Sequence, residues 1–348
     1  MQLYIHAFAH LLVDALCAAT IFGPLRAQTE LAALIWLYNT LAFSTQCLVG
    51  LLADRMKGQR GAAAAAMLCV IAGFALPLPA LGRIILVGLG NSLFHVAAGT
   101  ETLRASGGRA APLGIFVAPG AIGVTLGSLF PGLGPVLAAL LAAAAAASLL
   151  CKPAAHPPVT APAILPKRRS AAALLLTAAV AVRAVGGSGV SFPWQNGPLP
   201  VLLTTGCVFA GKLCGGFLCD RLGPKRSAWL SVPAAALLIT FCAAWALPAM
   251  LGQFAINLTM PVTLWLLYRA MPEAPGFAFG LAASALWPGT VAGKLIALTG
   301  PVRWVFLLLC FLFGLAAILY AASRLRKPSD PTLIREKGAL PCESAFSP

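Results

Sequence analysis

Ionisable side chains lie inside long apolar stretches of the sequence, where they could carry protons. His6, His10 and Asp14 are spaced four residues apart in the first stretch, so a helix places them on one face. His95 lies in the middle of a later stretch. Histidine changes its charge near neutral pH, and burial disfavours the ionised form of a carboxylic acid. The sequence therefore favours proton coupling through Asp14, His10 or His95. The alternative is that these groups only hydrogen-bond neighbouring helices, and for His6, close to the segment end, we favour that alternative.

Three basic side chains lie inside apolar stretches of the second half of the chain: Arg183, Lys212 and Lys294. No acidic residue accompanies them in those stretches. Buried cations without matching anions indicate a cavity that accepts a negatively charged substrate. The alternative is snorkelling, in which long basic side chains near a helix end extend to the lipid headgroups.

Composition places these groups in a membrane protein. The chain has 348 residues, of which 60% are hydrophobic and only 9% are charged, and its mean hydropathy is +0.90. Soluble domains carry about 25% charged residues, so that class is excluded. The net charge of +15 comes from basic residues in the gaps between apolar stretches, so we expect no nucleic-acid partner. Cysteines without metal spacing indicate small buried hydrophobes rather than ligands, and we expect no cofactor and no bound metal.

Twelve segments are long and apolar enough to cross a bilayer as helices. This predicts an all-α integral membrane protein with an amino-terminal six-helix bundle over 1–151, a linker over 152–169, a carboxy-terminal bundle over 170–324 and a disordered tail over 325–348. The expected spans are 3–25, 31–53, 61–79, 81–103, 111–132, 134–151, 170–192, 198–219, 227–246, 248–270, 276–299 and 302–323. Loops on the side of the amino terminus and the tail hold 18 Lys and Arg, against three on the other side. This bias predicts a multi-pass protein of the cell (inner) membrane with both termini in the cytoplasm.

The two halves of the sequence repeat at an offset of 166 residues. Two charged connectors carry the clearest copies, which pair Asp54 with Asp220, Arg55 with Arg221 and Arg60 with Arg226. At the same offset Asn91 pairs with Asn257, Gly123 with Gly289 and Gly127 with Gly293. A repeat of this length in so apolar a chain indicates two homologous membrane halves. We expect Asn91 and Asn257 to contribute to the substrate site beside Arg183, Lys212 and Lys294.

The connectors resemble the loop signature of the major facilitator superfamily, G-x-x-x-D-R-x-G-x-[KR]-[KR], in both places where that family carries it. The resemblance implies two pseudo-symmetric six-helix halves, functional as a monomer, that rock around a central site. It implies that the first and fourth helices line the cavity, so that Asp14, His10 and His95 meet. It also implies a cytoplasmic gate made of charged side chains, with Asp54 facing the amino end of the helix near Gly276. The gate residues are Asp54, Arg55, Arg60, Glu101, Arg104, Asp220, Arg221 and Arg226.

Three further stretches resemble the fosmidomycin-resistance-type transporters within that superfamily. They are the first-helix sequence from His10 to Asp14 followed by Pro24 and Leu25, the fourth-helix sequence from Gly90 to His95, and the fifth-helix glycines. The resemblance implies proton-driven export, by antiport, of a small anionic or polar compound. Proton-coupled uptake of a small organic anion, such as a carboxylate or phosphonate, stays open as the second interpretation.

Two other classes of protein fit the sequence less well. A membrane enzyme would use Gly186-Gly187-Ser188-Gly189, which spells the G-x-S-G of intramembrane serine proteases, but no histidine follows in any later span. A receptor or scaffold would need neither the repeat nor the charged groups inside the spans. The sequence therefore favours a transporter over an enzyme.

Overall fold

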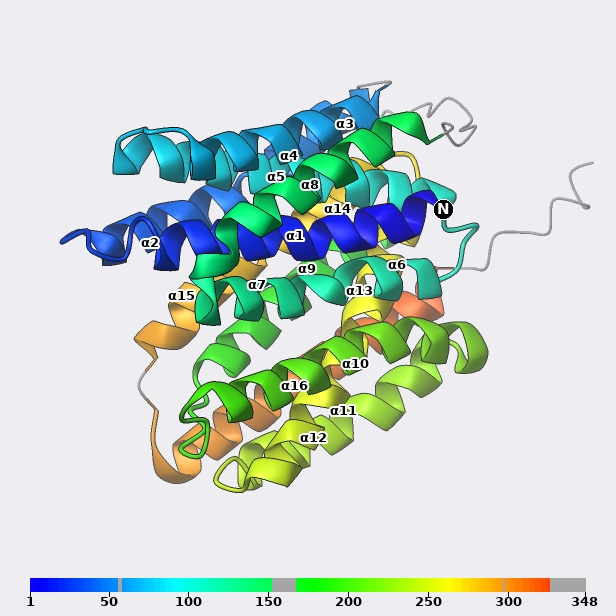
Figure 1. Ribbon diagram of the computed structural model, residues 1–348. Helices are drawn as coiled ribbons and strands as arrows, with labels where there is room; N and C mark the ends of the chain where they lie inside the picture. The colour runs from blue at the N-terminus through cyan, green and yellow to red at the C-terminus, as the bar shows by residue number, and fades with distance from the viewer. Residues whose placement is uncertain (56–57, 152–166, 297, 326–348) are drawn as a thin grey trace, which may run out of the picture.

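The computed structural model describes residues 1–55, 58–151, 167–296 and 298–325, and this part of the chain is helical, without a β-strand (Figure 1). The elements, in chain order, are α1 (Gln2–Phe22), α2 (Leu31–Asn39), η1 (Thr40–Ser44), α3 (Gln46–Arg55), α4 (Gln59–Ala75), α5 (Ala80–Ala105), α6 (Ala111–Val117), α7 (Pro119–Leu129), η2 (Pro131–Leu133), α8 (Gly134–Leu150), α9 (Lys167–Ser188), α10 (Pro198–Leu222), α11 (Pro224–Phe241), α12 (Ala246–Asn257), α13 (Thr259–Ala270), α14 (Pro275–Ser284), α15 (Leu286–Leu295) and α16 (Gly300–Arg324).

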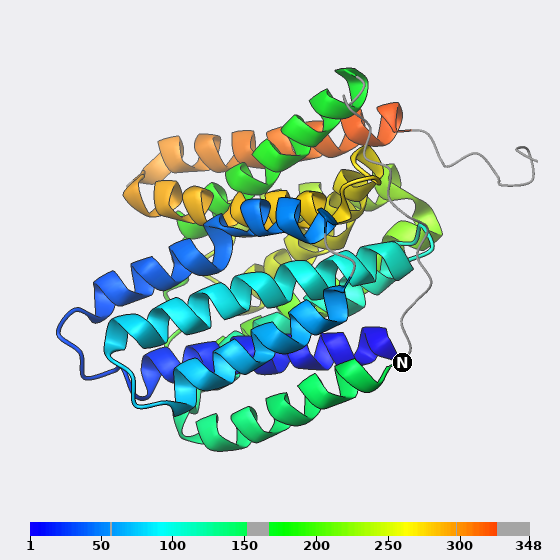
Figure 2. The same ribbon diagram turned by 90° about the horizontal axis from the view of Figure 1, so that it is seen from above.

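The helices run side by side, with α1, α3, α4, α5 and α8 on one side of the molecule and α10, α11, α12 and α16 on the other (Figures 1 and 2). Nine helical stretches of the described residues are long and apolar enough to cross a membrane, and α4 is a shorter apolar helix. Large apolar side chains, such as Leu48, Leu174, Leu230 and Leu312, are more than half exposed. Exposed apolar surface on this scale is typical of a protein surrounded by lipid.

Prolines set several helix boundaries and breaks, because proline has no N–H to donate within a helix. The predicted span 61–79 is too long at its end, since α4 stops at Ala75 ahead of Pro77 and Pro79. Pro119 separates α6 from α7. The helix α9 begins at Lys167, inside the linker predicted over 152–169. The rest of that linker, and the tail from 326, lie outside the described residues.

Glycines allow two pairs of helices to pack with their backbones in contact. A methyl group on Gly123 or Gly127 of α7 would overlap carbonyl groups of α1, and the same is true of Gly289 and Gly293 of α15 against α9. Small residues permit such close approach. The glycines that repeat at the 166-residue offset therefore make equivalent contacts, α7 against α1 and α15 against α9.

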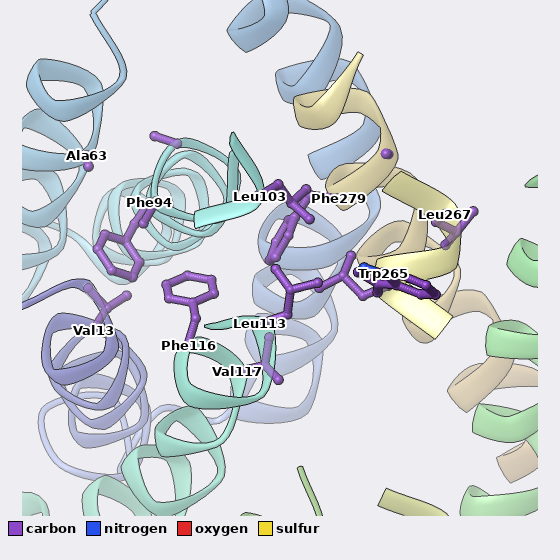
Figure 3. Close-up of a cluster of buried hydrophobic side chains, with 14 of the residues drawn as sticks. Val13, Ala63, Phe94, Leu103, Leu113, Phe116, Val117, Trp265, Leu267 and Phe279 are labelled. Carbon is purple, nitrogen blue, oxygen red and sulfur yellow. The ribbon is translucent and has the colours of Figure 1, made fainter. Parts of the chain in front are cut away.

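A cluster of buried side chains joins helices from both sequence halves (Figure 3). Phe94 of α5 and Phe116 of α6 are fully buried in it. The ring of Phe116 lies 6.0 Å, centre to centre, from that of Phe279 of α14. This cluster fixes α1, α5 and α6 relative to one another and therefore holds the polar groups that they carry.

Candidate functional site

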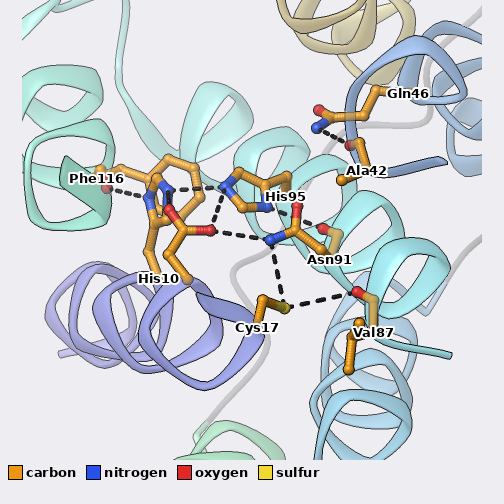
Figure 4. A network of polar contacts seen from close by, with 9 residues as sticks. His10, Cys17, Ala42, Gln46, Val87, Asn91, His95 and Phe116 are labelled. Carbon is orange, nitrogen blue, oxygen red and sulfur yellow. Dashed lines mark hydrogen bonds and ion pairs between the residues drawn. The ribbon is translucent and has the colours of Figure 1, made fainter. Parts of the chain in front are cut away.

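Three ionisable side chains meet between α1 and α5, and we call them the triad: His10, Asp14 and His95. His10 Nε2 lies 2.8 Å from His95 Nε2 (Figure 4). The Asp14 carboxylate reaches both rings, with Oδ2 at 3.3 Å from His10 Nε2 and Oδ1 at 3.7 Å from His95 Nε2. Both rings are buried, at 5% and 8% exposure. The tertiary structure thus brings together the three residues that the sequence predicts for proton coupling.

Each histidine ring is oriented by a hydrogen bond to a backbone carbonyl. His10 Nδ1 lies 2.7 Å from the oxygen of Phe116, and His95 Nδ1 lies 2.9 Å from the oxygen of Asn91 (Figure 4). A carbonyl oxygen only accepts hydrogen bonds, so both Nδ1 atoms carry hydrogen. In neutral rings, both Nε2 atoms then present lone pairs toward each other and toward the carboxylate.

The triad can hold a cation at its centre. Asp14 Oδ1 accepts from the Asn91 amide, but no donor among the described residues lies between the two imidazole lone pairs and the carboxylate that they face, and unpaired buried acceptors are costly. A proton satisfies the arrangement, because it converts one ring into an imidazolium that donates to its neighbours. In the described part of the chain, the triad is also the one group of His, Cys, Asp and Glu ligand atoms close enough to share a metal ion, all within 4.8 Å of one another.

Two neighbours shape the triad. The Asn91 amide donates to Asp14 Oδ1 at 2.9 Å and also faces the sulfur of Cys17 at 3.8 Å. Gly120 of α7 lies directly against the site, where a methyl group would contact His10 Nε2 and lie 2.5 Å from Asp14 Oδ2. Asn91, predicted as a substrate ligand, is therefore placed as a partner of Asp14. Nothing in the sequence indicated that Gly120 lies at this site.

The triad lines a cavity of about 380 Å³. The cavity extends along α1 and α7 to Phe22 and Ser128, at the end of the bundle opposite Met1. We call that end the far end and the end near Met1 the terminal end. Tyr38, Gln46 and Phe279 line the same cavity. A small molecule in it would lie directly against the titratable groups.

Two of the three predicted basic residues also line this cavity. Lys212 of α10 and Arg183 of α9 line it from helices of the second half of the chain. The guanidinium of Arg183 donates to Thr259 Oγ1 at 3.0 Å and has no carboxylate within 4.0 Å among the described residues. The cavity therefore has an acidic and imidazole side on α1 and α5 and a cationic side on α9 and α10.

Arg183 also lines a second cavity of about 190 Å³, enclosed by the carboxy-terminal helices. Asn257 lies in this smaller cavity and donates to the Gln253 carbonyl at 2.8 Å. Lys294 lines neither cavity and is exposed in the last turn of α15. The span predicted over 276–299 ends at Leu295, so Lys294 is close enough to a helix end to extend outward.

The two connector aspartates bind helix amino termini at the terminal end. Asp54 accepts hydrogen bonds from the backbone N–H groups of Gly276, at 2.7 Å, and Phe277, at 2.8 Å. Asp220 accepts from those of Ala110, at 2.6 Å, and Ala111, at 3.0 Å. The first N–H groups of a helix have no partner within the helix and attract negative charge. Each aspartate thereby ties its own half of the sequence to the other half.

The remaining predicted gate residues do not form one ion-pair cluster with these aspartates. Arg104 lies 3.9 Å from Asp54, but Glu101 pairs with His6 at 3.6 Å, and His6 also contacts Ser148 at 3.2 Å. Arg60 donates to the carbonyls of Leu149 and Cys151 at the end of α8. Three arginines, Arg55, Arg221 and Arg226, are exposed.

Sequence reasoning missed the contacts that join the two halves at the far end. The indole N–H of Trp287 donates to Thr40 Oγ1 at 3.0 Å, and its ring lies edge-on to Trp36, 5.2 Å centre to centre. The hydroxyls of Thr125 and Thr205 are 2.8 Å apart. Trp36 and Trp287 lie in apolar segments that face lipid as readily as protein, so the sequence carries no signal for them.

Comparison with known proteins agrees with the helical arrangement. No protein-family model and no curated protein sequence matches the chain. Among solved structures, the E. coli fucose:proton symporter FucP is similar, with a TM-score of 0.70 and 13% sequence identity over 93% of this chain and 98% of that one. FucP in the outward conformation, described as a major facilitator superfamily transporter, is similar with a TM-score of 0.65 and 15% identity over 93% of this chain and all of that one. The chain therefore has the fold of a major facilitator superfamily transporter.

Proposed function

We propose that the protein is a secondary active transporter that works by alternating access and couples proton movement to transport of a small anion. The observation that carries the proposal is the one cavity that the triad lines together with Lys212 and Arg183. A proton on the triad and an anion on the basic residues would occupy one cavity together, so binding of either changes the electrostatic energy of the other. This proximity supplies the physical link that coupled transport requires.

The membrane arrangement that we propose has twelve spans in two six-helix halves, over 1–151 and 170–324, acting as a monomer. The offset of 166 residues, the repeated glycine contacts of α7 with α1 and of α15 with α9, and the reciprocal aspartate contacts support it. The positive charge near the terminal end supports a cytoplasmic location for both chain ends in the inner membrane. The terminal end is then the cytoplasmic gate, held closed by Asp54 and Asp220.

For the direction of transport we propose export by proton antiport, on the resemblance to fosmidomycin-resistance-type transporters. Uptake with protons is the second candidate, and the similarity to FucP, a fucose:proton symporter, favours it. Both directions use the same groups, because alternating access is reversible and the gradients decide the net flow.

Transport and coupling are testable in proteoliposomes that enclose a pH-sensitive dye. Small carboxylates and phosphonates are screened for counterflow with EDTA on both sides, and internal pH is followed at the same time. The parent protein is expected to move protons with one of these anions. Asp14→Asn is expected to abolish proton movement while anion exchange continues, because the amide keeps the shape of the carboxylate and removes its charge.

Glu30→Gln is the matched control, since Glu30 is an exposed acid at the start of α2 without a side-chain capping bond. It should behave as the parent. Anion exchange at full rate without proton movement in the parent would show that the triad is structural and that the protein is a uniporter or exchanger. Absence of exchange for every small anion would contradict the proposed substrate class.

A further inference from the structure

The triad has the composition and the orientation of a metal-binding site, although the spacing of the sequence shows no metal motif. We propose that His10, Asp14 and His95 bind a divalent first-row transition metal ion, whose open coordination positions face the cavity and take a small anionic ligand. Imidazole nitrogen and carboxylate oxygen are ligands that zinc, iron, cobalt and nickel share. Two histidines with one carboxylate leave positions free for a further ligand.

The distances between the ligand atoms suit one shared ion. Two ligands at about 2.1 Å from a metal are about 3.0 Å apart at a right angle and about 3.4 Å apart at the tetrahedral angle. The observed separations are 2.8 Å between the two Nε2 atoms, 3.3 Å from His10 Nε2 to Asp14 Oδ2 and 3.7 Å from His95 Nε2 to Asp14 Oδ1. One ligand atom from each residue lies within 4.8 Å of the other two. They lie on both sides of those values, so small side-chain rotations bring all three groups onto one ion.

The second shell is already in place. Histidines that bind metals almost always donate their other ring N–H to a carbonyl or carboxylate, which fixes the tautomer and directs the free lone pair at the metal. Here Phe116 and Asn91 supply those carbonyls. The Asn91 amide in turn holds the Asp14 carboxylate. A histidine pair kept only for packing would not need both lone pairs directed to one point.

Space and charge decide what completes the coordination. Gly120 has no side chain where a methyl group would fill the site between His10 and Asp14. A divalent ion on one carboxylate leaves a net positive charge, and Lys212 and Arg183 add two more in the same cavity. This excess requires anions, so the ion is expected to enter with a negatively charged ligand that the basic residues hold.

The identity of the cargo rests on the proposed transport function, whereas metal binding does not. If the protein is a transporter, its substrate class becomes a complex of a divalent metal with a small carboxylate-type ligand. The ion would take the position that a shared proton takes in the proposed coupling, so one occupant excludes the other.

The test is a titration of the purified full-length protein in detergent, with any affinity tag removed, using Co²⁺ and visible absorption. One Co²⁺ per chain is expected, with d–d bands that Zn²⁺ abolishes. Malonate is expected to shift those bands in the parent and to do so less in Arg183→Gln. Asp14→Asn and His95→Gln are expected to lower the Co²⁺ affinity by more than the about 10–100-fold that loss of a second-shell partner costs.

His6→Gln is the matched control, because His6 lies on the same helix but contacts Glu101 and Ser148. It should bind Co²⁺ as the parent does. Gel filtration and thermal unfolding identify variants that fail to fold, and using two triad variants keeps the test decisive. Absence of Co²⁺ bands in the parent would overturn the proposal. The proposal would also be overturned if Asp14→Asn and His95→Gln both bound Co²⁺ as tightly as the parent. Near-ultraviolet thiolate charge-transfer bands would overturn it as well, because they would place the ion on cysteine.

The failures of the two proposals are distinguishable. Proton-coupled anion counterflow in EDTA, without Co²⁺ binding, would remove the metal site and keep the proposed function. Co²⁺ binding by the triad, with neither anion exchange nor proton movement, would keep the metal site and remove the transport function.

Discussion

Asp54 is expected to hold the terminal end closed, and Asp54→Asn should open it. The carboxylate accepts two backbone N–H bonds at the start of α14, and its side chain is only 12% exposed. Asparagine can accept one of these bonds, but its amide N–H group would face the second donor. The charge that favours the helix amino terminus is lost as well.

The magnitude follows from these contacts. A hydrogen bond to a charged group contributes about 1.5–3 kcal/mol, and a charge at a helix terminus about 0.3–1 kcal/mol. Loss of one such bond and of the charge therefore costs about 2–4 kcal/mol. Since about 1.4 kcal/mol is a factor of ten, the equilibrium between closed and open terminal ends should shift by at least about 30-fold.

Hydrogen–deuterium exchange with mass spectrometry measures this shift directly in detergent or nanodiscs. In Asp54→Asn, peptides that contain Gly276 and Phe277 should exchange faster. The peptide with Ala110 and Ala111, which are bound by Asp220, should follow, because opening the terminal end separates both contacts. Arg55→Gln is the matched control at an adjacent exposed position and should leave both peptides unchanged.

Two results would refute this reasoning. Unchanged exchange at both peptides would show that Asp54 contributes nothing to closure. Faster exchange confined to the α14 peptide would show that the two aspartate contacts do not open together and that the effect is local fraying of one helix.

Three further predictions follow from other contacts. Gly127→Ala should destabilise the protein by about 1–3 kcal/mol, because the added methyl group overlaps the backbone of α1. Thermal unfolding measures the loss. Gly132→Ala is the control and should have little effect, because a methyl group there meets no neighbouring atom of the described residues. Trp287→Phe removes one exposed hydrogen bond at the far end, worth about 0.5 kcal/mol. In alternating access a weaker contact at the far end favours the state in which the terminal end is closed. Exchange of the α14 peptide should therefore slow about twofold, the opposite of the effect of Asp54→Asn. If the cavity binds an anion as proposed, Arg183→Gln should weaken that binding by about 10-fold or more, since it removes a charged donor worth about 1.5–3 kcal/mol. Equilibrium binding of the anion found in the counterflow screen checks this. An unchanged affinity, or an equal loss in Arg226→Gln at an exposed position, would contradict it.

The sequence determined the class of the protein and most of the helices. Long apolar stretches can satisfy their backbone hydrogen bonds in lipid only as helices, so composition and length predict the all-helical structure. The break at Pro119 inside the expected span 111–132 has a local cause in the sequence, because proline has no N–H to donate. The repeat at 166 residues pairs Asp54 with Asp220, and the structure gives each of these aspartates the amino terminus of a helix as its partner.

Only the tertiary structure decided which polar groups share a site. Composition and spacing do not relate His95 to His10, which is 85 residues away. The family resemblance implied that the two residues meet, but only the packing of α1 on α5 fixes the 2.8 Å between their Nε2 atoms. The same holds for Lys294, which the sequence places with Arg183 but the end of α15 leaves exposed. The proposed metal site has no motif in the sequence, because its ligands come from two helices and converge only in the fold. The sequence determines where helices form and where they are interrupted, because these effects act between neighbouring residues. Which side chains meet across helices depends on how the helices pack.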